Sequence, residues 1–455
     1  MSKRTGGVVA LVGMCALSLL LVNCGSSSNR PAGLLYVISQ AFSPPNVVPS
    51  VSSFAIDLNS GVLSLVNSNA TTCTTLTQNP SVSCGLAVNI LLDPTGATAF
   101  VLNQGLSPTN STATVAPTIY GYTVNSDGSL SSPTTAQTLP LGDTSVTMTE
   151  NAAGTMLFVL DVGPTLTPAD CPTPGTATYG TDCPSILVYN ATPGSTTLSQ
   201  ASAYPLSSLP TSLSVMTFTP PNGGSTQTLL FVTSNKDLTG NQNDNQLMVF
   251  SVDSSGNLKP QISPLNLPYY TTLPNPMVVQ AVNTNPPPQT TGGVFVFVGS
   301  QGSVSGSVSV FQICTVVGQG SGVNTCNPQE VAVNQLIPVG TPSAAGNTPA
   351  AMVVDPTNSF LYVVSSGSNQ LFAFQISTGT GVLSPLSPAN QPTGATPVAL
   401  AMQTSFDALD NFLYTSNSTG ESITGFAASA TTGQLSTSSS TTLFTPGLPS
   451  GMAAR

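Results

Sequence analysis

The sequence predicts an all-β protein, a seven-bladed β-propeller of four-stranded antiparallel blades. Three observations predict it: the composition favours strands, one apolar strand recurs seven times, and the last residues supply a strand that the first repeat lacks. Of the 455 residues, 40% are hydrophobic and only 5% are charged, and no segment sets apolar residues at helical spacing opposite charged ones. The polar residues are mainly Ser, Thr, Asn and Gln, which suit strand faces and turns.

The recurring strand has an aromatic second residue in every copy and becomes polar by its end, which is the repetition expected of a propeller. The copies are residues 35–39, 99–103, 157–161, 230–234, 296–300, 361–365 and 413–417, with Tyr36, Phe100, Phe158, Phe231, Phe297, Tyr362 and Tyr414 as the aromatic residues.

Three further strands are predicted around each copy. A loop leads to a second strand, such as residues 370–374, and a tight turn leads to a third strand that begins with Leu63, Leu130, Leu258 or Leu383. From the second repeat onward an apolar stretch precedes the aromatic strand, and in two repeats it ends in Asp-Pro-Thr, at Asp93 and Asp355. Asp before Pro is a turn signal, because the carboxylate accepts from nearby backbone N–H groups. Four strands in units of about fifty residues are typical of propeller blades.

The first repeat lacks the leading strand, and the end of the chain supplies it. Residues 448–455 match residues 348–355, which lead into the sixth copy of the recurring strand. We therefore expect the C-terminal strand to join blade 1 and close the ring, which removes an exposed sheet edge. Residues 34–455 are predicted to form one propeller domain.

These residues carry a family resemblance. The Tyr-Val-x-Asn-like strands and the turn from Asp93 to Gly96 resemble the YVTN-type repeats of the lactonase family of seven-bladed propellers, which includes 6-phosphogluconolactonases. The resemblance implies the architecture over nearly the whole mature chain, and it implies lactone hydrolysis as an activity to test. No catalytic residue of the family can be assigned to a position in this chain.

The N-terminus resembles a bacterial lipoprotein signal. Residues 1–24 combine basic Lys3 and Arg4, an apolar core and a lipobox-like end at Cys24, preceded by Asn23 where the family prefers a small residue. We expect lipidation at Cys24, a flexible tether over residues 25–33, and a location in the cell envelope, attached by lipid to the outer membrane and facing the periplasm or the surface. An ordinary secretory signal and an uncleaved anchor are the alternatives.

Six further cysteines form three local couples, each within its own loop. They are Cys73 with Cys84, Cys171 with Cys183, and Cys314 with Cys326. An oxidising compartment permits disulfides, and closing a loop of this size contributes about 3 kcal/mol in the chain-entropy model. A metal site is disfavoured, because the chain has no CxxC spacing and no histidine.

The charges exclude one class of function. Six basic and sixteen acidic residues give a net charge of −10, and the predicted propeller contains only Lys236, Lys259 and Arg455 as cations. Nucleic-acid binding needs many cations that neutralise phosphates, so it is excluded. The lack of histidine removes every Ser-His-Asp, Cys-His and His-metal arrangement, and no cofactor is expected.

Long predicted insertions gather on one face of blades 1 to 4. They are residues 40–50, 71–86, 104–118, 162–184 and 236–246, and each follows the second or fourth strand of a blade. These loops are a predicted binding surface for a protein or glycan, although loop length also drifts without selection.

Four further motifs are weak indications of a functional site, and a structural role explains each of them more simply. Ser234 with Lys236 is a possible nucleophile–base pair, but a solvated lysine is the simpler reading. The oxygens of Asp237, Thr239, Asn241, Asn243 and Asp244 suit Ca²⁺, although their spacing is not that of an EF-hand. The Gly-rich stretch 318–322 has no helix after it, and Asp93, Asp127 and Asp355 are expected in turns.

Two functions follow as hypotheses. The first is a non-catalytic envelope scaffold that binds a protein or an uncharged glycan, whose hydroxyl groups would pair with Asn, Gln, Ser, Thr and Tyr. The alternative is a lactone hydrolase, which requires at least two convergent carboxylates or a bound cation in the central channel.

Overall fold

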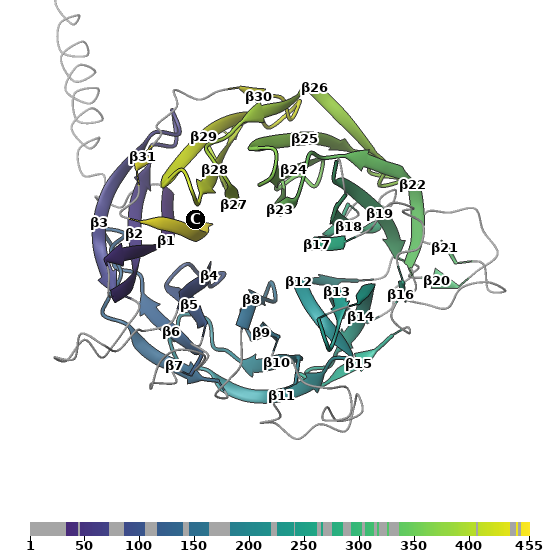
Figure 1. Ribbon diagram of the computed structural model, residues 1–455, viewed down its shortest axis with the longest axis horizontal. Coiled ribbons are helices and arrows are strands. Elements are labelled where there is room, and N and C mark those ends of the chain that lie inside the picture. Colours follow the sequence, from purple (N-terminus) through teal and green to yellow (C-terminus); the bar gives the residue numbers. More distant parts are fainter. Residues whose placement is uncertain are drawn as a thin grey trace, which may run out of the picture.

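The computed structural model describes residues 33–43, 46–71, 86–104, 116–139, 145–162, 183–219, 225–240, 242–261, 265–266, 275–284, 293–302, 305–313, 316–317, 325–326, 336–405, 408–436, 443–444 and 447–455. These residues form seven antiparallel sheets arranged as blades around one axis (Figure 1). They contain no helix that could span a membrane. The predicted signal, Cys24 and the tether as far as residue 32 lie outside the described residues.

Blades 1 to 4 each place four strands side by side from the axis outward. Blade 1 contains β32 (Leu448–Ala454), β1 (Gly33–Ser43), β2 (Asn46–Ile56) and β3 (Leu63–Thr71). Blade 2 contains β4 (Leu86–Leu92), β5 (Thr98–Gln104), β6 (Thr118–Thr123) and β7 (Thr134–Thr138). Blade 3 contains β8 (Ser145–Glu150), β9 (Met156–Asp161), β10 (Ser185–Asn190) and β11 (Ser199–Pro205). Blade 4 contains β12 (Ser208–Phe218), β13 (Gln227–Asp237), β14 (Asn243–Val252) and β15 (Leu258–Pro260), with β16 (Leu265–Asn266) also paired to β14.

The remaining three blades repeat this order. Blade 5 contains β17 (Asn275–Asn283), β18 (Val294–Gln301), β19 (Ser307–Ile313) and β22 (Leu336–Ala344). Blade 6 contains β23 (Pro349–Val354), β24 (Phe360–Ser365), β25 (Gln370–Ile376) and β26 (Leu383–Pro392). Blade 7 contains β27 (Pro397–Thr404), β28 (Asp410–Asn417), β29 (Ser422–Ser429) and β30 (Leu435–Ser436), with β31 (Leu443–Phe444) paired to β29. A separate parallel pair joins β20 (Val316–Val317) to β21 (Thr325–Cys326). The predicted fold class and the seven recurring strands are confirmed.

The C-terminal strand closes the ring as predicted. β32 pairs with β1 in antiparallel register, with Met452 opposite Val37 and Ala453 opposite Tyr36. Arg455 continues the ladder, because its N–H donates to the carbonyl of Leu34 at 2.9 Å and its carbonyl accepts from the N–H of Leu34 at 3.0 Å. The Arg455 guanidinium also donates to the carbonyl of Gly96 in blade 2 at 2.5 Å. The closing strand therefore holds both blade 1 and its neighbour.

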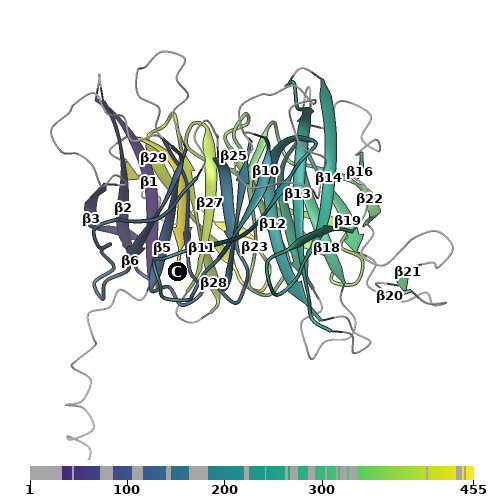
Figure 2. The same cartoon turned by 90° about the horizontal axis from the view of Figure 1, so that it is seen from below.

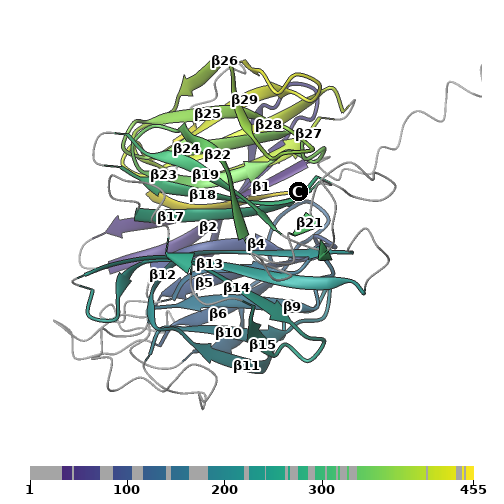
Figure 3. The same cartoon turned by 90° about the vertical axis from the view of Figure 1, so that its right-hand side faces the viewer.

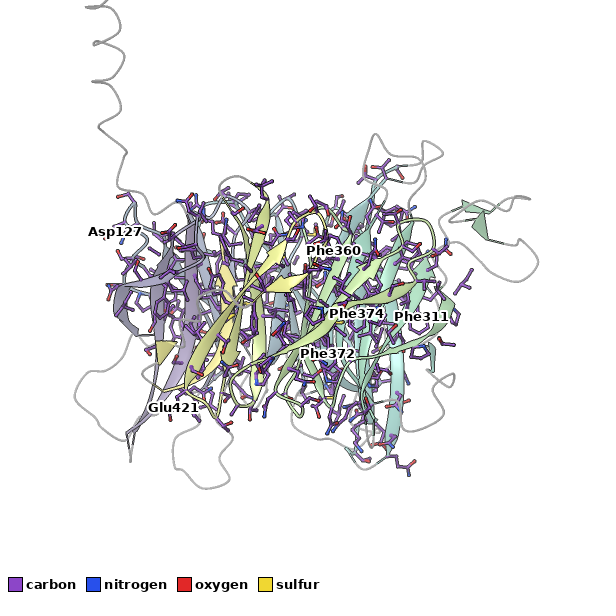
Figure 4. The ribbon with its side chains drawn as sticks, turned by 90° about the horizontal axis from the view of Figure 1, so that it is seen from above. Asp127, Phe311, Phe360, Phe372, Phe374 and Glu421 are labelled. Atoms are coloured by element: carbon purple, nitrogen blue, oxygen red, sulfur yellow. The ribbon has the colours of Figure 1, made fainter. Side chains whose placement is uncertain are left out.

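The strands run between two faces of the ring (Figures 2 and 3). One end, here called the turn face, has the connections after the first and third strands of the blades, including the turn that contains Asp127. The opposite end, the loop face, has the connections after the second and fourth strands, including the turn that contains Glu421. Figure 4 shows Asp127 and Glu421 at opposite ends of the blades.

The apolar core is divided among the seven spaces between adjacent blades. The described buried residues fall into seven clusters, and each joins two neighbouring blades. Successive residues of a recurring strand face opposite neighbours: Tyr36 packs toward blade 2, whereas Val37 packs toward blade 7. This explains why the recurring strands are apolar at consecutive positions, since each is buried on both sides.

A tyrosine at the aromatic position bonds to the following blade. The hydroxyl groups of Tyr36, Tyr362 and Tyr414 donate to the carbonyls of Gly128, Gly433 and Gly61 at 2.9, 3.1 and 2.8 Å. Each of these glycines lies in the turn between the third and fourth strands of the next blade, at a positive φ. Burial raises the pKa of all three tyrosines. They therefore serve as neutral donors between blades.

The aspartates of the turns have the structural role that was predicted. One oxygen of Asp355 accepts from the N–H groups of Ser359 and Phe360 at 2.7 Å each. Asp127 accepts from the N–H of Ser129 at 2.9 Å. Each carboxylate thus satisfies donors within the turn that it begins or occupies.

The structure differs from the sequence predictions at two insertions and at the start of one strand. Residues 40–43 and 46–50 continue the ladder of β1 and β2, with Gln40 opposite Pro49, because a hairpin can lengthen both strands while their backbone groups pair. Residues 236–237 and 243–246 likewise belong to β13 and β14, with Lys236 opposite Asn243. Leu130 forms only an isolated bridge with Val124, and β7 begins at Thr134. The insertions at 71–86, 104–118 and 162–184 lie almost wholly outside the described residues.

Among the six loop cysteines, only Cys183 has a described side chain. It is fully buried and takes part in a disulfide bond. Its predicted partner, Cys171, lies outside the described residues, as do Cys73, Cys84 and Cys314, and the side chain of Cys326 is not described. The three pairings stay predictions.

Candidate functional site

The first strands of all seven blades surround a cavity on the ring axis. These strands are β32, β4, β8, β12, β17, β23 and β27, which surround the axis in Figure 1. Each contributes residues to a cavity of about 380 Å³. We call this cavity the central channel. It is the natural candidate for a binding site, because seven blades converge on it.

Every inner strand has a β-bulge at the place where its channel-lining residues begin. In blades 4 to 7 and in blade 1, a proline opposes the buried polar residue that ends the recurring strand, as Pro349 opposes Ser365, and the register then shifts by one residue. Proline cannot donate to the ladder, so a bulge beside it costs little. Blades 2 and 3 shift at the same place without a proline. Because these strands form the inner edges of the sheets, runs of consecutive residues, such as Thr211 to Leu213, line the channel.

Hydroxyl and amide groups form one arc of the channel wall. They come from blades 1 to 5 and are Ser450, Asn89, Thr147, Thr149, Thr211, Ser212 and Gln280. Several join adjacent blades: Asn89 Nδ2 donates to Thr147 Oγ1 at 3.0 Å, and Thr211 Oγ1 donates to the Pro276 carbonyl at 2.9 Å. The arc therefore presents polar atoms that the blade contacts already hold in position.

Blades 6 and 7 supply the opposite, apolar arc. Their lining residues are Ala350, Ala351, Met352, Val398, Ala399 and Leu400. The hydrogen-bonding side chains of the channel are thus confined to blades 1 to 5, where they are interspersed with apolar residues such as Val88, Met148 and Val279.

No lining residue of the described channel is ionisable. The two convergent carboxylates that the hydrolase hypothesis requires are therefore not among its described residues. Nor do the described residues bring together three or more His, Cys, Asp or Glu side chains that could hold a metal.

Ser234, Lys236 and the polar residues among 237–244 come from the loop-face end of blade 4, and the described side chains among them have other partners. Ser234 Oγ donates to the carbonyl of Asp244 at 3.3 Å and accepts from Ser208 at 2.8 Å, whereas Lys236 Nζ donates to Asn243 Oδ1 at 2.8 Å. Asp237 accepts from the hydroxyl of Thr239 at 2.7 Å. Ser234 and Lys236 thus do not form a nucleophile–base pair, and Asn241 lies outside the described residues.

One ionisable residue with a buried carboxylate, Glu150, was not identified from the sequence. Glu150 ends β8 at the turn face, outside the channel lining, and both of its carboxylate oxygens are buried without a hydrogen-bond partner among the described residues. Burial, together with the charge of Asp93, raises its pKa to about 7. Nothing in the local sequence identifies it, since its burial depends on blade 2.

Comparisons with known proteins agree with this architecture. The model of the family described as lactonase, 7-bladed β-propeller, matches residues 305–444. A candidate 6-phosphogluconolactonase from Bacteroides uniformis superposes with a TM-score of 0.59 at 12% identity, covering 93% of this chain and 99% of that one. The periplasmic gluconolactonase PpgL of Pseudomonas aeruginosa superposes with a TM-score of 0.58 at 15% identity, covering 92% and 99%.

No curated protein matches the chain in sequence. At these identities the solved structures establish the shared fold and leave the chemistry open. The resemblance predicted from the repeats is confirmed: the chain is similar to the lactonase family of seven-bladed β-propellers, in sequence over residues 305–444 and in fold around the ring.

Proposed function

We propose that this protein is a binding module of the cell envelope that holds an uncharged, hydroxyl-rich ligand, such as the end of a glycan, in its central channel. The observation that carries the proposal is the described channel wall, which offers hydroxyl and amide groups and no ionisable side chain. Neutral donors and acceptors match sugar hydroxyls, whereas a phosphorylated or carboxylated ligand needs Arg or Lys.

The apolar arc supports a sugar over other neutral ligands. A pyranose ring has hydroxyl groups at its edge and C–H groups on its faces. Thr149 and Gln280 can bond the hydroxyl edge while Ala350 and Val398 contact the C–H face. A purely polar ligand would leave the aliphatic arc in contact with water, which is unfavourable.

The experiment is a glycan array probed with the full-length protein, followed by calorimetry with the sugar that binds best. Thr149→Val keeps the side-chain volume and removes a hydroxyl from the channel, so we expect a loss of affinity of about three- to tenfold, the value of one neutral hydrogen bond. Thr217→Val makes the same change at an exposed position on β12 and should leave affinity unchanged. The absence of any glycan binding contradicts the proposal.

A lactone hydrolase is the second candidate, favoured by the similarity in fold to the gluconolactonase of P. aeruginosa. Its test is hydrolysis of D-glucono-δ-lactone and its 6-phosphate, compared with the buffer rate. Turnover that Thr149→Val and Gln280→Leu reduce would replace the binding proposal with this one. The same variants thus distinguish the two candidates.

The envelope location rests on the lipobox-like residues before Cys24. β1 begins with Gly33 at the turn face, so a lipid on Cys24 would place that face toward the membrane and the loop face away from it. Incorporation of labelled palmitate into the wild-type chain, and its loss in Cys24→Ser together with release from the membrane fraction, is the expected result. Palmitate labelling that persists in Cys24→Ser contradicts it.

A further inference from the structure

Glu150 lies in the seam between blades 2 and 3. It is the last residue of β8, where it pairs with Leu157 of β9. Met148, two residues earlier and therefore on the same side of the strand, packs in the core that joins blade 2 to blade 3. The carboxylate of Glu150 is thus directed toward blade 2. Both of its oxygens are buried, and neither has a hydrogen-bond partner among the described residues.

Asp93 is the charged neighbour of Glu150 in this seam. Although burial opposes its ionisation, the hydroxyl of Thr95 and the N–H groups of Thr98 and Gly194 donate to it, and the pKa of Asp93 lies below its ordinary value. The bond from Gly194, at 2.8 Å, comes from the turn after β10 in blade 3. Asp93 therefore remains ionised and ties blade 2 to blade 3.

The two carboxyl groups meet no counter-charge in the described seam. The turn that follows Glu150, residues 151–155, and the turn that holds Gly194, residues 190–198, have no ionisable side chain. Arg455 bonds to the carbonyl of Gly96 in the turn that Asp93 begins, but the field acting on Glu150 comes from Asp93. A second negative charge in this place is unfavourable.

We propose that Glu150 is held as a neutral acid in the seam between blades 2 and 3, and that loss of its proton loosens this seam, so that the ring contains a pH-sensitive joint. Burial first, and the charge of Asp93 second, raise the pKa of Glu150 from 4.5 to about 7. The seam between blades 2 and 3 is therefore most stable in mildly acidic surroundings and is weakened above neutrality.

The consequence for stability has a definite sign. Between pH 4.5 and about pH 7 the unfolded chain has released the proton of Glu150 while the folded chain retains it. The folded state binds more protons, so stability is fullest below pH 4.5, falls as the pH rises, and levels off above about pH 7. Over that interval the folding equilibrium weakens by up to about tenfold per pH unit.

The chain is well suited to a direct measurement, because it contains only three glutamates, Glu150, Glu330 and Glu421. We expect a protein labelled with ¹³C at the glutamate carboxyl to give one signal that is absent in Glu150→Gln and that titrates with a midpoint near pH 7. A Glu150 signal that has finished titrating by about pH 5.5 overturns the proposal.

The second measurement tests the seam. Urea unfolding of the wild type between pH 5 and pH 8 should show the fall in midpoint, and Glu150→Gln, which keeps the shape and stays neutral, should abolish it. Glu421→Gln makes the same change at a turn of the loop face and should keep the fall. The chain has no histidine to titrate in this range. An equal fall in Glu150→Gln contradicts the coupling of the proton to the seam.

Discussion

At the scale of single residues, the choice between tyrosine and phenylalanine in the recurring strand has a physical reason. Both rings fill the space between blades, but only tyrosine reaches the carbonyl in the hairpin turn of the next blade. The four blades with phenylalanine at this position show that the ring alone meets the packing requirement. The hydroxyl is therefore an added bond between blades 1 and 2, 6 and 7, and 7 and 1.

Removing that hydroxyl should weaken the ring by a measurable amount. Tyr362→Phe leaves the buried carbonyl of Gly433 without its donor, so we expect a loss of about 1–2 kcal/mol in the free energy of unfolding, measured with urea. Tyr204→Phe is the control, because the Tyr204 ring packs on Phe250 at 5.0 Å and its hydroxyl has no hydrogen bond among the described residues. Equal losses in the two variants would show that the bond to Gly433 contributes nothing.

At the scale of elements, the tight turns combine a backbone requirement with a contact to the neighbouring blade. Gly433 has φ +67°, and a Cβ there would lie 2.3 Å from Cδ1 of Phe360 in blade 6. Gly194 has φ +79°, but a Cβ there would meet nothing within 4 Å. The two glycines thus separate conformational strain from crowding.

We expect both alanine variants to lose about 1 kcal/mol from the left-handed backbone, and Gly433→Ala to lose about 1–3 kcal/mol more from overpacking. The measurement is the urea midpoint of Gly433→Ala against Gly194→Ala. If the two variants are equally stable, then the turn of blade 7 is free to move away from Phe360 and the blades are less tightly fitted than the structure indicates.

The elements also show which parts of the structure can be predicted from the sequence. The recurring strands and their turns are predictable, because burial on both faces and Asp-Pro-Thr turns leave a local pattern. The channel wall is not, because the inner strand is the edge of each sheet and a run of consecutive residues, such as Met277 to Gln280, lines the channel, so alternation does not identify the lining. The prolines before Thr211, Met277, Ala350, Val398 and Ser450 were the available signal. Glu150 left none, since its environment comes from another blade.

At the scale of the whole molecule, the ring depends on one strand from the far end of the chain. β32 gives β1 its inner partner and places Met452 in the core between blades 7 and 1. Without it, β1 would have an open edge near the axis, and Leu35 and Val37 would lose part of their cover.

Deletion of residues 448–455 tests this dependence. We expect the shortened chain to lose its single cooperative thermal transition and to associate through the open edge of β1, as measured by calorimetry and by light scattering. A synthetic peptide of residues 447–455 should restore a cooperative transition, whereas a peptide of the same composition in scrambled order should not, because the register places Met452 opposite Val37. A shortened chain that stays monomeric and melts like the full-length protein would mean that the blade contacts alone hold the ring, and that β32 occupies an edge the fold can leave open.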